Sequence, residues 1–578
     1  MNTQNTVLPE RMAFALRLGV GVVFGLAMAA LVHHDLIKND HPAPWKIVAE
    51  STLALSAFIW WAGAGNMRRL TLAIWGVAIT AVIAALACHQ MQQGATSEAF
   101  AFFSRSGWLV VPLLFIAHEL VSSGDRASRP VAPYATYFDQ AWKHGVQLAL
   151  AVLFTGLFWV ILFLGAALMG FIGFHWFGDL LQKDWVALPL TGAALACGVQ
   201  LGDVQDKILV NIRALVLSVL SWLLPVITLI CLLFLGGLCL SGLEPLWKTK
   251  AASVTLLGAG VILVLLINAA YQQGDIERAV HIGMKWAARL ACLLLPAFAA
   301  LATYSLWLRI DQYGLTPERV LAGTGIAIGI LFAAGYATAA VWPGRWLTLL
   351  ERVNVAMAFV EILILLCPLT PLADPMRLSV ADQIARLQSG KIATDHFAWH
   401  MLRFETGRYG QDALKALAKS GATKTIRADA ATADAWGDSD RYGTPTSPEV
   451  PPVVDDMKRL KVVYPAGATL PATFTSRILG VSGIGDCLRD AAKTCTVALI
   501  DLNDDHKPEI AVLDENSVKV FTQGGGTWKE MRTYAVDLDE NGIKAFNAGQ
   551  IAAQSHPWSD LTVGKSHVVV DSGAPDSD

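Results

Sequence analysis

A short acidic segment near the end of the chain has the side chains best suited to bind a metal ion. The segment LIDLNDDHKPEIAVL spaces five oxygen donors in one loop: the side chains of Asp501, Asn503, Asp505 and Glu509 and the main-chain carbonyl of Lys507. Ca²⁺ takes about six to eight oxygens at roughly 2.3–2.6 Å, which a tight loop supplies by alternating carboxylates, amides and carbonyls. The spacing therefore predicts a calcium loop, and an acidic β-turn is the alternative.

The flanks of this loop decide which kind of calcium loop it is. An EF-hand has Glu in the twelfth place and a helix on each side, but here Val512 stands in that place and both flanks alternate like strands. The segment resembles the loops of integrin-type FG-GAP and related β-propeller repeats, which implies a strand–loop–strand site. Such loops usually have Gly in the sixth place, where φ is positive; here it is His506, which tolerates that conformation at modest strain. We expect a weak site that stabilises a sheet.

Polar residues within long apolar segments form a second group of candidates. Glu361 lies near the middle of VNVAMAFVEILILLCPL, Arg17 lies near the start of the first apolar segment, and Asn268 lies near the end of the eighth. An ionisable group in mid-bilayer costs several kcal/mol unless it is paired or hydrated, so each is a functional candidate. Glu361 is either a neutral carboxyl bonded to a neighbouring helix or a proton- or ion-coupling group. We expect Arg17 to snorkel or to pair with Glu361.

The neighbours His118 and Glu119 are less distinctive. They lie near the inner end of the fourth apolar segment, where we expect them at the membrane interface.

These residues must be held by a bundle of membrane helices. Of the 578 residues, 54% are hydrophobic and 16% are charged, and the apolar residues gather into segments of about 17–25 residues, the length that crosses a bilayer as helix. We count eleven candidate spans between Met1 and Leu372, with centres near Val22, Leu55, Ala78, Val111, Phe158, Ala194, Val226, Val261, Pro296, Gly329 and Val360.

The positive charges in the loops predict an orientation. If the N-terminus is cytoplasmic, the inner segments hold thirteen Lys and Arg residues and the outer loops hold eight, which follows the positive-inside rule. Eleven spans then place everything after Leu372 outside the cytoplasm.

Beyond the last span the sequence changes character. We expect a transmembrane domain over 1–372, a helical segment over 373–420, a flexible linker rich in Ala, Asp, Thr and Pro over 421–452, a small β-rich domain over 453–570 and a disordered tail over 571–578. The fold is therefore mainly α, with a small β domain at its end. Neither part has the basic groove of a nucleic-acid-binding protein.

Two of the eight cysteines lie in the predicted β-rich domain. Cys487 and Cys495 bracket CLRDAAKTC, and the other six lie within or at the ends of apolar segments. A pair isolated in a domain outside the cytoplasm predicts a disulfide, and closing so short a loop contributes about 2–3 kcal/mol. Two free thiols are the alternative.

Several longer passages carry a family resemblance. LRIDQYGLTPERV, PLADPMRLSVADQIARLQSGKI, FAWHMLRFETGRYG and the Cys-flanked acidic loop at the end resemble the uncharacterised bacterial polytopic membrane proteins grouped under domain of unknown function 4153. The resemblance implies an inner-membrane location. It implies no activity and no catalytic residues.

Three functions fit these observations. The chain has no Walker loop, His-Glu-x-x-His, Gly-x-Ser-x-Gly or dinucleotide fingerprint in its proper context, which favours a protein that is not an enzyme. The first hypothesis is an envelope anchor, sensor or scaffold whose periplasmic β domain binds Ca²⁺ or an envelope protein. The second is a proton- or ion-coupled transporter or channel using Glu361. A membrane enzyme acting on a lipid-linked substrate ranks third.

Overall fold

The computed structural model divides the chain into two compact units. Unit 1 comprises residues 1–391 and 405–413, and unit 2 comprises residues 392–404 and 414–578. The described residues are 7–37, 44–92, 101–204, 206–243, 246, 252–274, 281–343, 346–436, 460–471, 473–474, 495–502, 506–514, 517–524, 527–530, 538, 540–551, 561–563 and 566–568.

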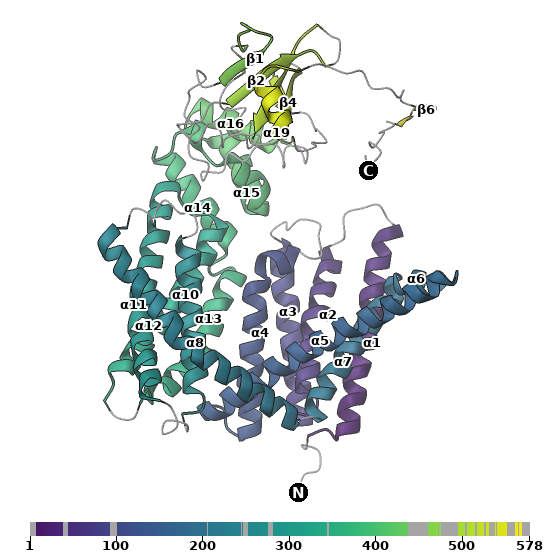
Figure 1. Cartoon of the computed structure of the whole chain (residues 1–578), viewed down its shortest axis with the longest axis vertical. Helices are drawn as coiled ribbons and strands as arrows, with labels where there is room; N and C mark the ends of the chain where they lie inside the picture. The colour runs from purple at the N-terminus through teal and green to yellow at the C-terminus, as the bar shows by residue number, and fades with distance from the viewer. Residues whose placement is uncertain are drawn as a thin grey trace. The chain divides into compact units, whose positions relative to one another are not determined.

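Unit 1 is a bundle of long helices (Figure 1). The helices are α1 (Glu10–Ile37), α2 (Pro44–Gly63), α3 (Arg69–Gln92), α4 (Ala101–Ala127), α5 (Tyr134–Phe171), α6 (Trp176–Leu181), α7 (Asp184–Val204), α8 (Asp206–Ser241), α10 (Ala252–Tyr271), α11 (Ile282–Tyr313), α12 (Pro317–Val341), α13 (Leu349–Leu369) and α14 (Pro375–Gln388). The predicted mainly α membrane fold is therefore confirmed.

The predicted number of spans is not confirmed. Each of the eleven predicted centres lies in one of these helices, but within the described ranges nine helices are long and apolar enough to cross a membrane. The two others are α2 and α4. Their apolar character is weakened by polar residues, which include Lys46 and Glu50 in α2 and His118 and Glu119 in α4.

Loops that the charge pattern placed on one side of the membrane contact one another in the structure. Arg68 Nε lies 2.8 Å from Asp125 Oδ1, and Arg213 Nη1 lies 2.6 Å from Asp139 Oδ1. All four residues belong to segments predicted to face the cytoplasm. The structure therefore brings Arg68 close to Asp125 and Arg213 close to Asp139, and the orientation of the bundle stays a prediction.

The close packing of α1 and α7 depends on small residues. A Cβ atom added at Gly21 would meet the main chain of Gly192, and one added at Gly25 would lie 2.6 Å from Pro189 Cα. Apolar side chains gain little by leaving lipid for a neighbouring helix, so membrane helices associate where small residues let their main chains approach. Gly21 and Gly25, four residues apart on one face of α1, provide such a contact.

The outer surface of the bundle is apolar. On α5 the exposed side chains include Val160, Ile161 and Leu164, and on α8 they include Leu215 and Trp222. A soluble protein does not expose so much contiguous apolar surface, whereas a bilayer contact requires it. With 38 residues, α5 is about 57 Å long, longer than the ~30 Å hydrocarbon layer, and it runs obliquely to its neighbours (Figure 1).

Helix α14 packs against the turn between α11 and α12 in unit 1. Asp374 accepts a hydrogen bond from the main-chain N–H of Met376 at 2.9 Å, which caps the helix start. Gln383 Nε2 donates to the carbonyls of Tyr313 and Leu315, at 3.0 and 3.1 Å. These bonds fix α14 to the turn between α11 and α12.

Unit 2 contains further helices before its sheet. These are the 3₁₀-helix η2 (Thr394–His396), the π-helix η3 (Met401–Glu405), α15 (Gly407–Ser420), which begins in unit 1, and α16 (Lys424–Asp434). Helix α16 lies within 421–452, so the prediction of a flexible linker is wrong for these residues. Thr423 caps the helix, and Ile426, Ala430 and Ala433 bury one face. The linker was predicted from amino-acid composition, which does not reveal the helical spacing of these three residues.

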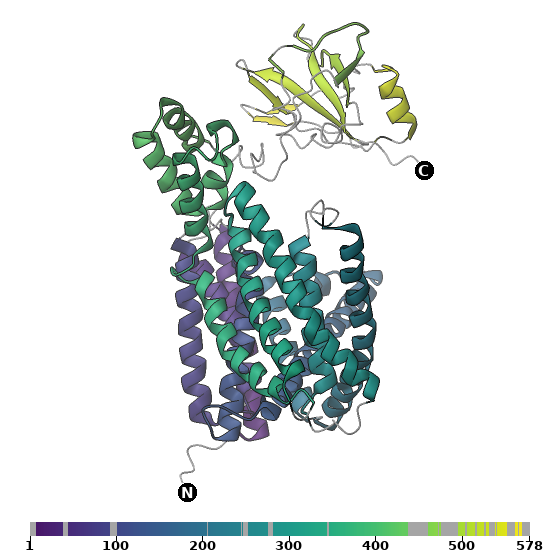
Figure 2. The ribbon, with the colours of Figure 1, turned by 90° about the vertical axis from the view of Figure 1, so that its left-hand side faces the viewer.

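The sheet of unit 2 has five strands in the order β1-β2-β3-β4-β5. Figure 2 shows this sheet in green to yellow. The strands are β1 (Leu460–Tyr464), β2 (Cys495–Ile500), β3 (Glu509–Asp514), β4 (Ser517–Gly524) and β5 (Thr527–Glu530). β1 and β2 are parallel, and the other neighbours are antiparallel. A two-stranded sheet pairs β6 (Leu561–Val563) with β7 (Ser566–Val568).

Both faces of the five-stranded sheet are covered. Val497 and Val512 belong to the cluster that includes Phe474, whereas Ala498 and Ala511 pack with Phe546 of α19 (Glu540–Asn547). This alternation is the two-residue period of a β-strand. The predicted strands therefore form a sheet with two buried faces.

Candidate functional site

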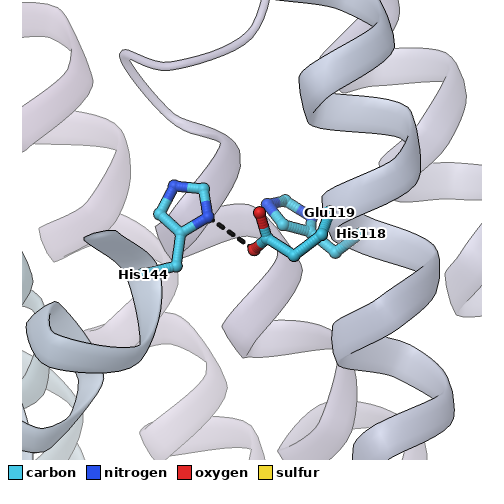
Figure 3. A group of neighbouring side chains, drawn as sticks. All are labelled: His118, Glu119 and His144. Atoms are coloured by element: carbon cyan, nitrogen blue, oxygen red, sulfur yellow. Dashed lines mark hydrogen bonds and ion pairs between the residues drawn. The ribbon is translucent and has the colours of Figure 1, made fainter. Parts of the chain in front are cut away.

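Three titratable side chains meet inside the bundle of unit 1. His118 and Glu119 lie on α4 and His144 lies on α5; their side chains point toward one another in Figure 3. One ring nitrogen or carboxylate oxygen from each lies within 4.8 Å of the others. All three residues are buried, with exposed fractions of 0%, 5% and 2%. This group is called the His–Glu–His cluster below.

The hydrogen bonds of the cluster leave several polar atoms unused. Glu119 Oε1 lies 2.6 Å from His144 Nδ1, so one proton is held between the carboxyl and the imidazole. Trp75 of α3 donates its indole N–H to His118 Nδ1 at 3.3 Å. Among the described residues, His118 Nε2, Glu119 Oε2 and His144 Nε2 have no hydrogen-bond partner. A buried polar atom without a partner costs about 1–3 kcal/mol, so three together need an explanation.

A bound transition metal is one explanation, but two contacts oppose it. A neutral imidazole has one ring nitrogen able to accept, and on His118 the Trp75 indole already occupies that nitrogen. Ligands on tetrahedral zinc lie about 3.3 Å apart, whereas Glu119 and His144 are 2.6 Å apart and directly bonded. A ligating His usually donates its second nitrogen to an acceptor, which the indole is not. These contacts therefore do not fit the geometry of a tetrahedral zinc site.

The polar side chains of α5 extend the cluster along one helix face. The buried residues of α5 include Gln140, His144, Gln147 and Thr155. Their spacing of three or four residues, or a multiple of it, places them on one stripe of the helix. Gln147 Nε2 donates to the Val199 carbonyl of α7 at 2.6 Å. A stripe of buried polar side chains is costly in a membrane bundle, so it is a candidate for a functional role.

A buried ion-pair network lies next to this stripe. Arg17 is 1% exposed and donates to Asp203 and to Gln200 Oε1, the latter at 2.5 Å. Lys143, one residue before His144, lies 3.0 Å from the second Asp203 oxygen. The expectation that Arg17 snorkels or pairs with Glu361 is therefore wrong. Arg17 instead joins α1 to α7 through a carboxylate that sequence reasoning did not identify.

Asn268 belongs to a closed ring of hydrogen bonds. Its amide donates to the Tyr336 hydroxyl, the hydroxyl donates to Asn354 Oδ1, and the Asn354 amide donates back to Asn268 Oδ1, each at 2.7 Å. Tyr336 is fully buried. Because every member of this ring is satisfied, Asn268 has a structural role in joining α10, α12 and α13.

Glu361 borders an apolar cavity of about 220 Å³ between α10, α11, α12 and α13. The other described lining residues include Leu257, Val261, Phe298 and Phe332. In the described part of the chain no residue hydrogen-bonds to the Glu361 carboxyl. The alternative of a carboxyl bonded to a neighbouring helix is thus not supported, and the cavity that reaches Glu361 is apolar.

The acidic loop is only partly described. It joins antiparallel strands β2 and β3, so its flanks form the expected strand–loop–strand, but Asn503 and Asp505 lie outside the described residues. His506 has φ +64°, as the sixth place of such a loop requires. Its main-chain N–H donates to Asp501 Oδ2 at 2.9 Å, and Glu509 Oε2 accepts from the Leu502 N–H at 2.9 Å. The roles of Lys507 and of the loop in Ca²⁺ binding stay predictions.

The disulfide also stays a prediction. Cys495 is buried in β2, whereas Cys487 lies outside the described residues. The six cysteines in or near apolar segments are free thiols.

Sequence reasoning missed the most suggestive site. His118 and Glu119 were expected at the membrane interface, but the structure encloses them among helices. Their partner His144 is 25 positions away on the next helix. Its four-residue spacing from Gln140, just before the apolar segment centred near Phe158, was the available signal.

Comparison with known proteins assigns the chain to a family without assigning a role to the cluster. Searches among curated proteins and among solved structures found no match. A family model described as "Domain of unknown function (DUF4153)" matches residues 51–419, well over half of the chain, including most of α2, all of α3 to α14 and the His–Glu–His cluster. The chain is therefore an integral membrane protein that belongs to the DUF4153 family.

Proposed function

We propose that this protein conducts protons through the His–Glu–His cluster, as a proton-linked transporter or channel does. The observation that carries the proposal is the 2.6 Å bond between Glu119 and His144, with three further buried ring and carboxyl atoms left without partners. An imidazole and a carboxylate in hydrogen-bond contact can pass a proton from one to the other. Intramembrane His and Glu residues of this kind form proton relays in pumps and transporters.

The polar stripe of α5 supplies a route to the cluster. Gln140 and Lys143 line a cavity of about 360 Å³, and Gln140 lies one helical turn from His144. Gln147 continues the stripe on the other side of His144. This arrangement supports proton exchange between the cavity and the cluster, and it favours the cluster over Glu361, whose cavity is apolar.

Proton flux across reconstituted membranes tests the proposal. In liposomes with an internal pH-sensitive dye, an imposed potential is expected to drive proton entry through the wild-type protein. Glu119→Gln or His144→Gln should lower that flux at least ten-fold, because positioned acid–base groups contribute about 10²–10⁴-fold to proton transfer. Each variant removes proton exchange at one position while retaining similar volume.

The matched controls are His175→Gln and Glu318→Gln, both at exposed positions outside the cluster, which should leave the flux unchanged. Unchanged flux in both cluster variants would contradict the proposal. Loss of flux in Glu361→Gln alone would assign the coupling to Glu361. Stoichiometric zinc in the purified protein that disappears in His144→Gln would show a metal site in place of a proton site.

The C-terminal unit supports a second proposal. We propose that the loop between β2 and β3 binds Ca²⁺ weakly, outside the cytoplasm of a bacterium whose inner membrane holds the bundle. The supporting observation is the positive φ of His506, together with its N–H bond to Asp501 Oδ2. Asp501 Oδ1 is buried and has no partner among the described residues, so it is available to a cation. The positive-inside pattern supports this orientation.

Calorimetry on the full chain with CaCl₂ tests the calcium proposal. A dissociation constant of about 10⁻⁴–10⁻³ M is expected, the range of extracellular modules. Asp501→Asn should weaken binding about ten-fold or more, since it removes a charged ligand. Asp412→Asn, at an exposed position on α15, is the matched control. Equal binding heats for Asp501→Asn and the wild type would refute the site.

A further inference from the structure

The cavity beside the cluster has an unusual charge. It lies between the end of α4 and the starts of α5 and α8 and has a volume of about 360 Å³. The polar residues described in its lining are Arg126, Thr136, Asp139, Gln140, Lys143 and Arg213. Three of these side chains are cations and one is an anion.

The carboxylate and the cations are unequally matched. Arg213 Nη1 lies 2.6 Å from Asp139 Oδ1, so these two charges offset each other. Lys143 contacts Asp203 at 3.0 Å, and Arg17 contacts the same carboxylate. The described side chains that line the cavity comprise three cations and one carboxylate, which is a formal excess of two positive charges.

Arg126 presents its charge to the cavity. With the Gln140 amide oxygen turned toward it, the guanidinium donates from Nε at 3.2 Å and from Nη1 at 2.7 Å. Gln140 is 4% exposed, so a fixed side chain orients Arg126, which is itself exposed. No carboxylate contacts Arg126 within the described ranges. A guanidinium held by a neutral amide retains its full charge for a ligand.

The remaining wall determines where a ligand could come from. Leu209 and Val210 of α8 line the cavity, and Val210 is 56% exposed on the apolar outer surface. The cavity thus borders lipid-facing surface on one side and the loop end of the bundle on the other. A ligand with an anionic head is accommodated whether or not it also has an apolar tail.

We propose that this cavity binds a phosphoryl group, either of an anionic lipid or of a soluble phosphate. Two arginines and a lysine converge on it, and a guanidinium matches phosphate oxygens with two parallel N–H bonds. Thr136 and Gln140 add neutral donors. A phosphate monoester, with a charge of about −2, offsets the excess of two charges, and the phosphodiester of a lipid head group offsets one of them. Basic pockets between helices at the cytoplasmic side are suited to phosphate head groups.

Binding of two probes to the full chain tests this site. Thermal shift in detergent is measured with inorganic phosphate, with chloride at equal ionic strength as reference. Binding to lipid is measured by native mass spectrometry after exchange into nanodiscs of phosphatidylcholine with or without phosphatidylglycerol. Stabilisation by phosphate indicates a soluble ligand, and retention of phosphatidylglycerol indicates a lipid head group. Either result supports the site. The absence of both responses would overturn it.

Variants connect the response to the cavity. Arg126→Gln should weaken binding about ten-fold, because one charge-assisted contact is lost, and raised salt should reduce the difference. Asp139→Asn should tighten binding, since it frees Arg213 and removes the competing carboxylate. Arg129→Gln, at an exposed position nearby that is not part of the cavity lining, is the matched control. Equal effects of Arg126→Gln and Arg129→Gln, or weaker binding by Asp139→Asn, would overturn the proposal.

Discussion

Asp203→Asn is expected to lower the free energy of unfolding of the membrane bundle by about 3–5 kcal/mol. The substitution leaves Arg17, which is 1% exposed, without its carboxylate partner, and an uncompensated buried charge costs that much. Tryptophan fluorescence during denaturation in detergent measures the change, because Trp61 donates its indole N–H to the Arg17 carbonyl.

The control for this prediction is an exposed ion pair that also contains an aspartate. Asp311 lies 2.9 Å from Lys391 and both side chains are more than half exposed, so Asp311→Asn should leave the transition where it is. The double variant Arg17→Met/Asp203→Asn should recover part of the loss, since it removes the unpaired charge. Equal effects of Asp203→Asn and Asp311→Asn would show that Arg17 is hydrated.

Gly21→Ala is expected to destabilise the contact of α1 and α7 by about 1–3 kcal/mol. The new Cβ would overlap the Gly192 carbonyl group, with the carbonyl carbon at 2.6 Å, and would lie 3.2 Å from the Ala193 nitrogen. These are main-chain atoms of a helix and cannot rotate away, so the helices must separate. Gly19→Ala is expected to change the stability in the opposite direction. Nothing lies within 4 Å of a Cβ at Gly19, and removing a helical glycine stabilises by about 0.5–1 kcal/mol.

Melting temperatures of the two variants, measured in the same detergent, distinguish packing from helix propensity. If the α1–α7 contact determines stability, Gly21→Ala melts below the wild type and Gly19→Ala melts at or above it. A rise for both would mean that propensity dominates and that the helices adjust at little cost.

Helix α5 has a polar half and an apolar half. Its N-terminal half holds the buried residues Gln140, His144 and Gln147, whereas its C-terminal half exposes apolar side chains such as Ile161 and Leu164. A helix that only anchored the protein would not need the polar half. The long, oblique α5 therefore connects the cavity and the cluster to the lipid-facing surface.

The sequence by itself determined the elements and their faces. Each apolar segment became a helix because a main chain in lipid must satisfy its own hydrogen bonds. The alternation in TVALI and EIAVL predicted strands, and the loop spacing anticipated the positive φ of His506. These properties depend on neighbours within a few residues, which the sequence displays directly.

Only the tertiary structure decided which polar groups meet. The sequence placed Arg17 and His118 inside or near apolar segments, but hydrophobic periodicity does not reveal which helices carry their partners. Arg17 is 186 positions from Asp203 and His144 is 25 from Glu119. Helix periodicity fixes which side chains share a face, whereas the choice of neighbouring helix depends on close main-chain contacts such as that of Gly21 and Gly192. For this reason the His–Glu–His cluster and the cationic cavity became visible only in three dimensions.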